Sequence, residues 1–159
     1  MNINLIRAEE KHLSALARME KECFTNPWSS TQLLLELKNE HSFVLLAEKD
    51  GEFLGFVILR TLLDEGEIFN IAVCRNARQL GIGGALLQAA IQHAEAENVE
   101  NIFLEVLASN GPAIALYKKY GFEPVGLRKK YYDNPTEDAR IMVRRSETRG
   151  ETEHAHTLD

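Results

Sequence analysis

The segment RQLGIGGALL, residues 78–87, constrains the fold more than any other part of this sequence. It lies between a β-rich run and a long stretch with apolar residues at helical spacing. Glycines at 81, 83 and 84 leave the main chain open to a ligand, and the first N–H groups of a helix have no partner within it. Because the helix dipole is positive at that end, an anion such as pyrophosphate is favoured there. A helix that merely starts with flexible glycines is the plainer interpretation.

Two familiar phosphate motifs are absent from this segment. The dinucleotide fingerprint needs a further glycine where Leu86 stands, and a P-loop needs Gly-Lys-Ser/Thr. The segment therefore predicts a strand-to-helix junction that binds some other phosphate-bearing group.

Local signals predict the remaining helices and strands. Ser29 and Gln32 form a capping-box pattern, Asp50-Gly51 is a strong hairpin signal, and Glu65-Gly66 offers a second turn. Asn110 is a candidate N-cap, and Gly121 a candidate left-handed residue that ends the same helix. The expected helices are 9–22, 29–38, one from 81 onward and 110–120, and the expected strands are 4–7, 42–48, 52–62, 66–73, 101–107, 123–132 and 139–145.

These elements predict an α/β fold, in which a mixed, mostly antiparallel sheet of about seven strands is flanked by four helices. We expect the strands on either side of the central helix to pair in parallel, so this helix should cross over with a right hand. The length of 159 residues fits one domain. We assign it to residues 1–146 and expect the polar tail, residues 147–159, to be disordered.

Composition excludes several classes of function. A net charge of -6 argues against a nucleic-acid binder. No apolar run approaches the roughly 20 residues that span a bilayer, and the N-terminus lacks the pattern of a signal peptide. Cys23 and Cys74 have no metal-ligand spacing, and neither do the five histidines. We therefore expect a cytoplasmic, monomeric protein without a metal.

Glu105 interrupts the apolar strand 101–107, where a lone buried carboxylate is costly. An edge position, or a carboxylate held by backbone donors, explains it as well as a catalytic role does. Tyr117 lies on an apolar helical stripe and reads by spacing as a core aromatic. Residues 71–73 read as ordinary strand.

The glycine segment resembles the signature of the GNAT family of acetyltransferases, Gln/Arg-x-x-Gly-x-Gly/Ala, whose fixed positions are filled by Arg78, Gly81 and Gly83. The resemblance covers about residues 3–145, because the element order matches too. Several strings narrow it to the branch that acetylates the N-terminal alanine of the eighteenth protein of the small ribosomal subunit. They are Asn26-Pro27-Trp28-Ser29, Phe69-Asn70-Ile71-Ala72-Val73, Leu104-Glu105-Val106, Ser109-Asn110, Ala113-Ile114-x-Leu116-Tyr117, Gly121-Phe122, Tyr131-Tyr132 and Glu137-Asp138-Ala139.

The resemblance implies roles for these residues. Glu105 matches the general base, with Glu67 as a rival on the neighbouring strand, and Tyr117 matches the acid that protonates the leaving thiolate. Tyr131 and Tyr132 would border the peptide groove. Gly84 departs from the family, which often has a basic residue there to contact phosphate. The implied acetyl-CoA contacts are Ile71, Ala72 and Val73 for the pantetheine, the segment Arg78, Gln79, Leu80, Gly81, Ile82, Gly83 and Gly84 for the pyrophosphate, and Asn110 and Tyr117.

The implied reaction is direct acetyl transfer from acetyl-CoA to the α-amine of a basic ribosomal protein, without a covalent enzyme intermediate. An α-ammonium has a pKa near 7.7–8.0, against about 10.4 for lysine, so a modest base suffices. Two alternatives stay open, because fold does not fix substrate. One is transfer to a lysine or a small amine, and the other is a non-catalytic acyl-CoA-binding module.

Overall fold

The structure is a computed structural model that describes residues 3–78, 80–133 and 136–146. Its element order matches the order predicted from the sequence, with two short 3-10 turns added. The elements are β1 (Asn4–Arg7), η1 (Glu10–His12), α1 (Leu13–Cys23), α2 (Ser30–Lys38), β2 (Ser42–Lys49), β3 (Glu52–Leu62), β4 (Glu65–Val73), η2 (Arg75–Ala77), α3 (Ile82–Ala96), β5 (Asn101–Leu107), α4 (Gly111–Lys119), β6 (Glu123–Asp133) and β7 (Thr136–Arg145).

These elements form two units, Met1–Arg60 with Ile68–Ile91, and Thr61–Glu67 with Gln92–Asp159. The predicted tail, 147–159, lies outside the described residues. In the first unit β1, β2, β3 and β4 follow one another across the sheet, and β1–β2 and β2–β3 are antiparallel. In the second unit β7 lies between β5 and β6, and both pairings are antiparallel.

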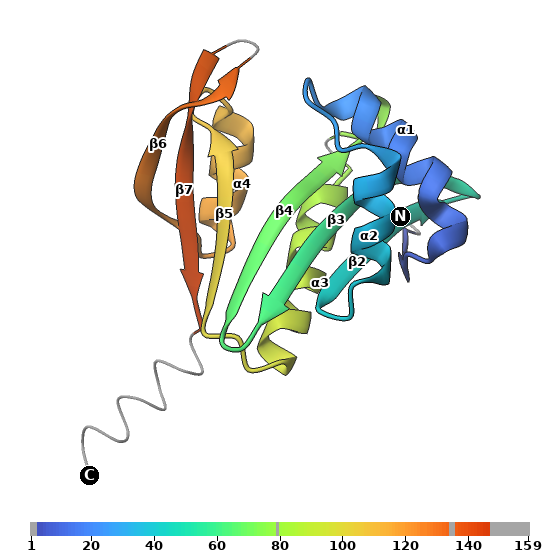
Figure 1. The fold of residues 1–159 in the computed structure, drawn as a ribbon, viewed down its shortest axis with the longest axis horizontal. Coiled ribbons are helices and arrows are strands. Elements are labelled where there is room, and N and C mark those ends of the chain that lie inside the picture. Colours follow the sequence, from blue (N-terminus) through green and yellow to red (C-terminus); the bar gives the residue numbers. More distant parts are fainter. Residues whose placement is uncertain (1–2, 79, 134–135, 147–159) are drawn as a thin grey trace. The chain divides into compact units, whose positions relative to one another are not determined.

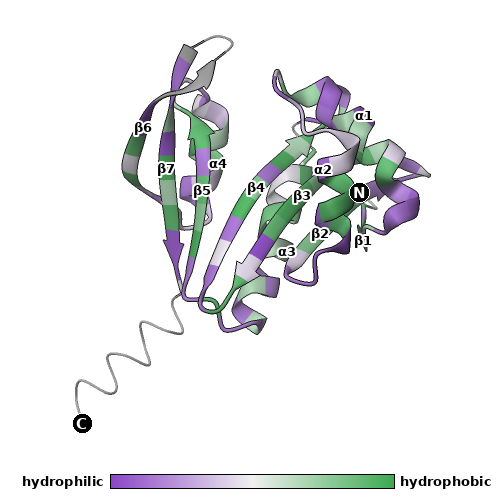
Figure 2. Ribbon diagram, viewed as in Figure 1, coloured by the Kyte–Doolittle hydropathy of each residue, from purple (hydrophilic) through white to green (hydrophobic). Residues whose placement is uncertain are grey.

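Helices cover both faces of the sheet in the first unit. Figure 1 shows α3 behind β3 and β4, with α1 and α2 in front. Strand β3 is accordingly buried at every position from Leu54 to Leu59, and it stands out as strongly apolar in Figure 2. At Gly55 an added Cβ would lie 2.6 Å from the Ala72 carbonyl oxygen and 3.3 Å from side-chain atoms of Ile82 and Leu86. Glycine thus allows the close approach of β3, β4 and α3.

The local signals for turns and caps are confirmed at four sites. Ser29 and Gln32 form both bonds of the capping box, with N···O distances of 3.1 and 2.8 Å. Asp50 and Gly51 adopt φ values of 52° and 83°, as a tight hairpin requires. Asn110 caps α4 through a 3.2 Å bond from the Ala113 N–H, and Gly121, with φ 94°, ends that helix.

The turn predicted at Glu65-Gly66 is wrong. The chain turns two residues earlier, at 63 and 64, and Leu63 adopts a φ of 56°. This left-handed conformation costs a non-glycine residue about 1–2 kcal/mol. Gly66 is instead buried within β4. Strand pairing therefore outweighs the intrinsic turn preference of glycine here.

Within the described ranges, no helix has the length and apolar character needed to cross a membrane.

Candidate active site

The glycine segment begins α3 as predicted. Gly81 has a φ of 81° and accepts the first helical bond, 3.1 Å from the Ala85 N–H. The N–H groups of Ile82, Gly83 and Gly84 therefore have no acceptor within the helix. A Cβ placed on Gly81 would meet no atom within 4 Å, so the space beside the helix start is open. Both properties fit the binding of a phosphate-bearing group.

Arg78 connects the loop before α3 to the end of β4. Its Nε donates to the Val73 carbonyl oxygen at 3.4 Å, which ties the loop to the end of β4. In β4 itself, Ala72 is buried, whereas Ile71 and Val73 are half-buried. Leu80 is exposed, and Gln79 lies outside the described residues.

Glu105 lies on the less buried face of β5. The strand alternates, with Ile102, Leu104 and Val106 buried and Phe103, Glu105 and Leu107 half-buried. The Glu105 side chain is 19% exposed, and its Oε1 lies 2.7 Å from Nη2 of Arg128 on β6. A guanidinium, rather than a backbone donor, is thus the contact that offsets the partial burial of this carboxylate.

The sheet register explains how Arg128 reaches Glu105 across β7. Arg128 and Leu107 are both paired with Ala139, whereas Glu105 is paired with Ile141. Directly paired side chains share a face of the sheet, so Arg128 lies on the Glu105 face, one row along. Ala139 is small enough for the long arginine side chain to pass over β7.

The second unit also holds Tyr117, on α4. This residue is 7% exposed, and its ring centroid lies 6.0 Å from that of Phe122 in an edge-on arrangement. The Phe122 N–H also bonds to the Tyr117 carbonyl oxygen at 3.0 Å. The ring therefore packs in the core as its spacing predicts, and its role as an acid stays a prediction.

The remaining candidates from the sequence are the rival base and the two tyrosines expected at the peptide groove. Glu67, the rival base, is exposed on β4. The side chains of Tyr131 and Tyr132 lie outside the described part of the structure. Among the described residues, no group of three or more His, Cys, Asp or Glu side chains could hold a metal ion.

The sequence analysis missed a buried carboxylate, Glu20 on α1, which is fully buried. Its Oε1 accepts the Trp28 N–H at 2.8 Å and its Oε2 accepts Asn70 Nδ2 at 2.5 Å. Burial raises the pKa of Glu20, against the opposing effect of both bonds. The network joins α1, the α1–α2 loop and β4 within the first unit. Both Trp28 and Asn70 belong to the strings that carried the family resemblance, but nothing in the sequence linked them to Glu20.

The two cysteines are free thiols of the first unit. Burial raises the pKa of both Cys23 and Cys74. Because the thiolate is the nucleophilic form, neither side chain is suited to carry an acyl group.

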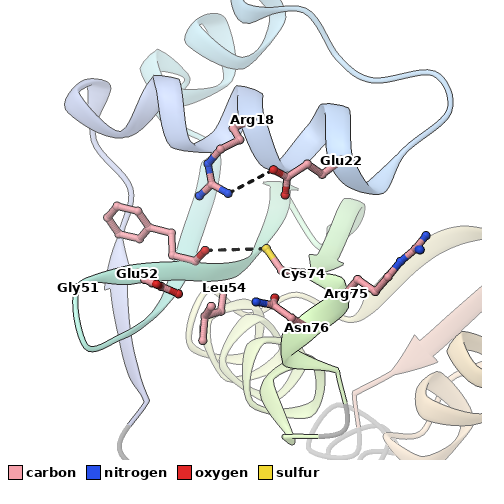
Figure 3. A pocket seen from close by; sticks show the side chains of 9 residues that line it. Arg18, Glu22, Gly51, Glu52, Leu54, Cys74, Arg75 and Asn76 are labelled. Carbon is pink, nitrogen blue, oxygen red and sulfur yellow. Dashed lines mark hydrogen bonds and ion pairs between the residues drawn. The ribbon is translucent and has the colours of Figure 1, made fainter.

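A cavity of about 710 Å³ opens in the first unit, beside the end of β4 (Figure 3). The ion pair of Arg18 with Glu22 lies on one side of it, and Cys74 contacts the Phe53 carbonyl oxygen on another. None of the residues predicted to bind coenzyme lines it. The lining is mixed in charge and consists of Arg18, Glu22, Gly51, Glu52, Phe53, Leu54, Cys74, Arg75 and Asn76.

Comparison with known proteins gives consistent matches. Residues 13–122 match the model of the acetyltransferase (GNAT) family. The chain is 36% identical to the ribosomal protein bS18-alanine N-acetyltransferase of Escherichia coli, over 83% of this chain and 87% of that protein. It is 41% identical to an N-alpha-acetyltransferase of Sulfurisphaera tokodaii, over 67% of this chain and 71% of that one. The crystal structure of the ribosomal-protein-S18-alanine N-acetyltransferase from Escherichia coli superposes with a TM-score of 0.85 at 33% identity, covering 91% of this chain and 94% of that one.

Proposed function

Because the chain belongs to the GNAT family of acetyltransferases, we propose that it is an acetyl-CoA-dependent N-α-acetyltransferase that modifies the N-terminal alanine of ribosomal protein bS18. The choice of substrate is supported by the 36% identity to a bS18-alanine N-acetyltransferase along 87% of that protein's length.

The start of α3 is suited to the pyrophosphate of acetyl-CoA. The N–H groups of Ile82, Gly83 and Gly84 offer three donors at the positive end of the helix dipole. The open space beside Gly81 would leave room for the phosphates. Ile71, Ala72 and Val73 would hold the pantetheine, and Arg78, Gln79, Leu80 and Asn110 would complete the contacts. Gly84 supplies no positive side chain, so backbone donors carry most of the phosphate binding.

Glu105 is the proposed general base. Its carboxylate takes a proton from the peptide α-ammonium, directly or through a water, and leaves a neutral amine that attacks the thioester carbonyl carbon. As the carbon–sulfur bond breaks, Tyr117 donates its phenolic proton to the leaving sulfur, and the proton that the attacking nitrogen loses on forming the amide restores the phenol. A thiol pKa near 8.5 and a phenol pKa near 10 differ by about 1.5 units, or roughly 2 kcal/mol. A desolvated site can offset that difference.

Direct transfer is favoured over a covalent acyl-enzyme. The raised pKa values of Cys23 and Cys74 keep both thiols protonated. Two free thiols also fit a reducing compartment, and a ribosomal-protein substrate would be met in the cytoplasm. The substrate would be the N-terminal segment of a basic protein, which the net charge of -6 would attract.

The test is acetyl-CoA turnover with a panel of acceptors. It contains a basic peptide that begins with alanine, the same peptide with its α-amine blocked, a lysine peptide and a polyamine. The proposal predicts the highest kcat/KM for the free alanine peptide and no comparable rate for the blocked one. Equal rates for the free and blocked peptides would assign the enzyme to lysine or small amines, and no turnover with any amine would leave a coenzyme-binding module.

A further inference from the structure

We propose that Arg128 is a positioning residue, which holds Glu105 in orientation and weakens the grip of its carboxylate on the acceptor ammonium. The inference rests on the proposed role of Glu105 as the base. It starts from one contact, the 2.7 Å distance between Arg128 Nη2 and Glu105 Oε1.

The ion pair with Arg128 orients the Glu105 carboxylate. A carboxylate has two oxygens and about four acceptor directions. The guanidinium contacts Oε1 and fixes the rotamer of Glu105, which leaves Oε2 to accept the proton of the amine. Because Phe103, Leu107 and Ile141, the same-face neighbours along β5 and in register on β7, are apolar, none of these side chains can replace the arginine as a hydrogen-bond donor.

The ion pair also changes the charge that the acceptor meets at Glu105. An unpaired carboxylate would hold the acceptor more tightly as its ammonium, the form that must lose a proton before its nitrogen can attack. The positive charge of Arg128 offsets the negative charge of the Glu105 carboxylate, so the ammonium is held less tightly and the neutral amine is relatively favoured. Arg128 is 53% exposed at its side chain, so water screens the effect and its expected size is modest.

This account predicts opposite changes in the two kinetic constants. In Arg128→Gln, KM for the amine should fall about 1.5- to 5-fold, the range expected for an exposed ion pair. The value of kcat should fall about tenfold, because the base is less well oriented. A purely structural role would not lower KM while it lowers kcat.

Two further variants sharpen the test. Arg128→Lys keeps the positive charge but not the planar fork, so KM should return to the wild-type value while kcat recovers only in part. Arg140→Gln is the matched control. Arg140 is exposed on β7 and paired with Val106 and Leu127, which places it on the opposite face of the same strands. The Arg140→Gln substitution also removes one positive charge, but it should leave both kcat and KM unchanged.

The four proteins are compared with acetyl-CoA and the amine that the wild type acetylates fastest. The affinities of a free and an α-blocked alanine peptide are measured beside them by calorimetry, where Arg128→Gln should bind the free peptide more tightly. A wild type that prefers lysine or a polyamine contradicts the proposed substrate but still permits the test of Arg128. Equal constants in wild type and Arg128→Gln, an equal loss in Arg140→Gln, or no gain in affinity for the free peptide would overturn the inference.

Discussion

The Arg128 guanidinium lies 2.7 Å from the Glu105 carboxylate, although β7 separates the strands that carry the two residues. The acidic residue that interrupts the apolar strand 101–107 therefore has a charged partner. This pairing explains how β5 tolerates a carboxylate that is only 19% exposed. The kinetics of a Glu105 variant distinguish a structural from a catalytic carboxylate.

Replacing Glu105 with glutamine should separate these two roles. The amide still offers an oxygen to Arg128, so the fold should survive, but it cannot take a proton at neutral pH. We expect kcat to fall by about 10²–10⁴-fold with unchanged coenzyme affinity. Glu67→Gln, on the exposed side of β4, is the control and should keep most of its activity. A lowered Tm with near-normal kcat in Glu105→Gln would instead favour the structural role.

Two glycines with nearly the same φ test the coenzyme site. Gly81 and Gly51 have φ values of 81° and 83°, and a Cβ on either meets no atom within 4 Å. Alanine should therefore cost about 1–2 kcal/mol of folding free energy at both positions. Only Gly81→Ala should weaken acetyl-CoA binding in calorimetry, because only Gly81 adjoins the free N–H groups of α3. Equal coenzyme affinity in the two variants would remove the glycine segment from the site.

Tyr117→Phe removes only a hydroxyl and keeps the ring against Phe122. If Tyr117 is the acid, kcat should drop steeply while coenzyme still binds, since the sulfur must leave unprotonated. The defect should shrink with an acyl donor whose leaving thiol has a lower pKa. If the residue serves only the core, stability should change by no more than about 0.5–1.5 kcal/mol and kcat by little. The kcat values with both donors distinguish the outcomes.

The buried Glu20 should make the free energy of unfolding depend on pH. Burial raises its pKa in the folded protein above the unfolded value, so the folded state binds the proton more tightly. The contribution to stability is complete below the unfolded pKa and is lost as the pH rises through the folded pKa. Glutamine at position 20 does not titrate, and Asn70 can turn its amide to match it. The free energy of unfolding of wild type relative to Glu20→Gln, from urea denaturation, should therefore fall with rising pH. A constant difference between acidic and neutral pH would contradict this.

Features encoded within a few residues could be predicted from the sequence. The capping box at Ser29, the hairpin at Asp50-Gly51 and the helix end at Gly121 each depend on local backbone chemistry. The turn at Leu63 could not be predicted, because the extent of strand pairing overrides the preference of Gly66 for a turn.

Contacts between distant residues could not be predicted either. Glu20 and Asn70 are 50 positions apart, and no local pattern in the sequence links one to the other. Glu105 was singled out because it breaks an apolar strand, but no local signal selects Arg128 among the basic residues of the following strands. The register of β5, β7 and β6 selects it, and that register is a property of the folded sheet.

The most direct test of the central claim is to locate the acetyl group after reaction. A basic peptide that begins with alanine and contains internal lysines is incubated with the protein and acetyl-CoA, and its fragments are sequenced by tandem mass spectrometry. The account predicts a single acetyl group on the α-nitrogen of the alanine, with every lysine unmodified. Acetyl groups on lysine side chains with a free N-terminus would contradict it.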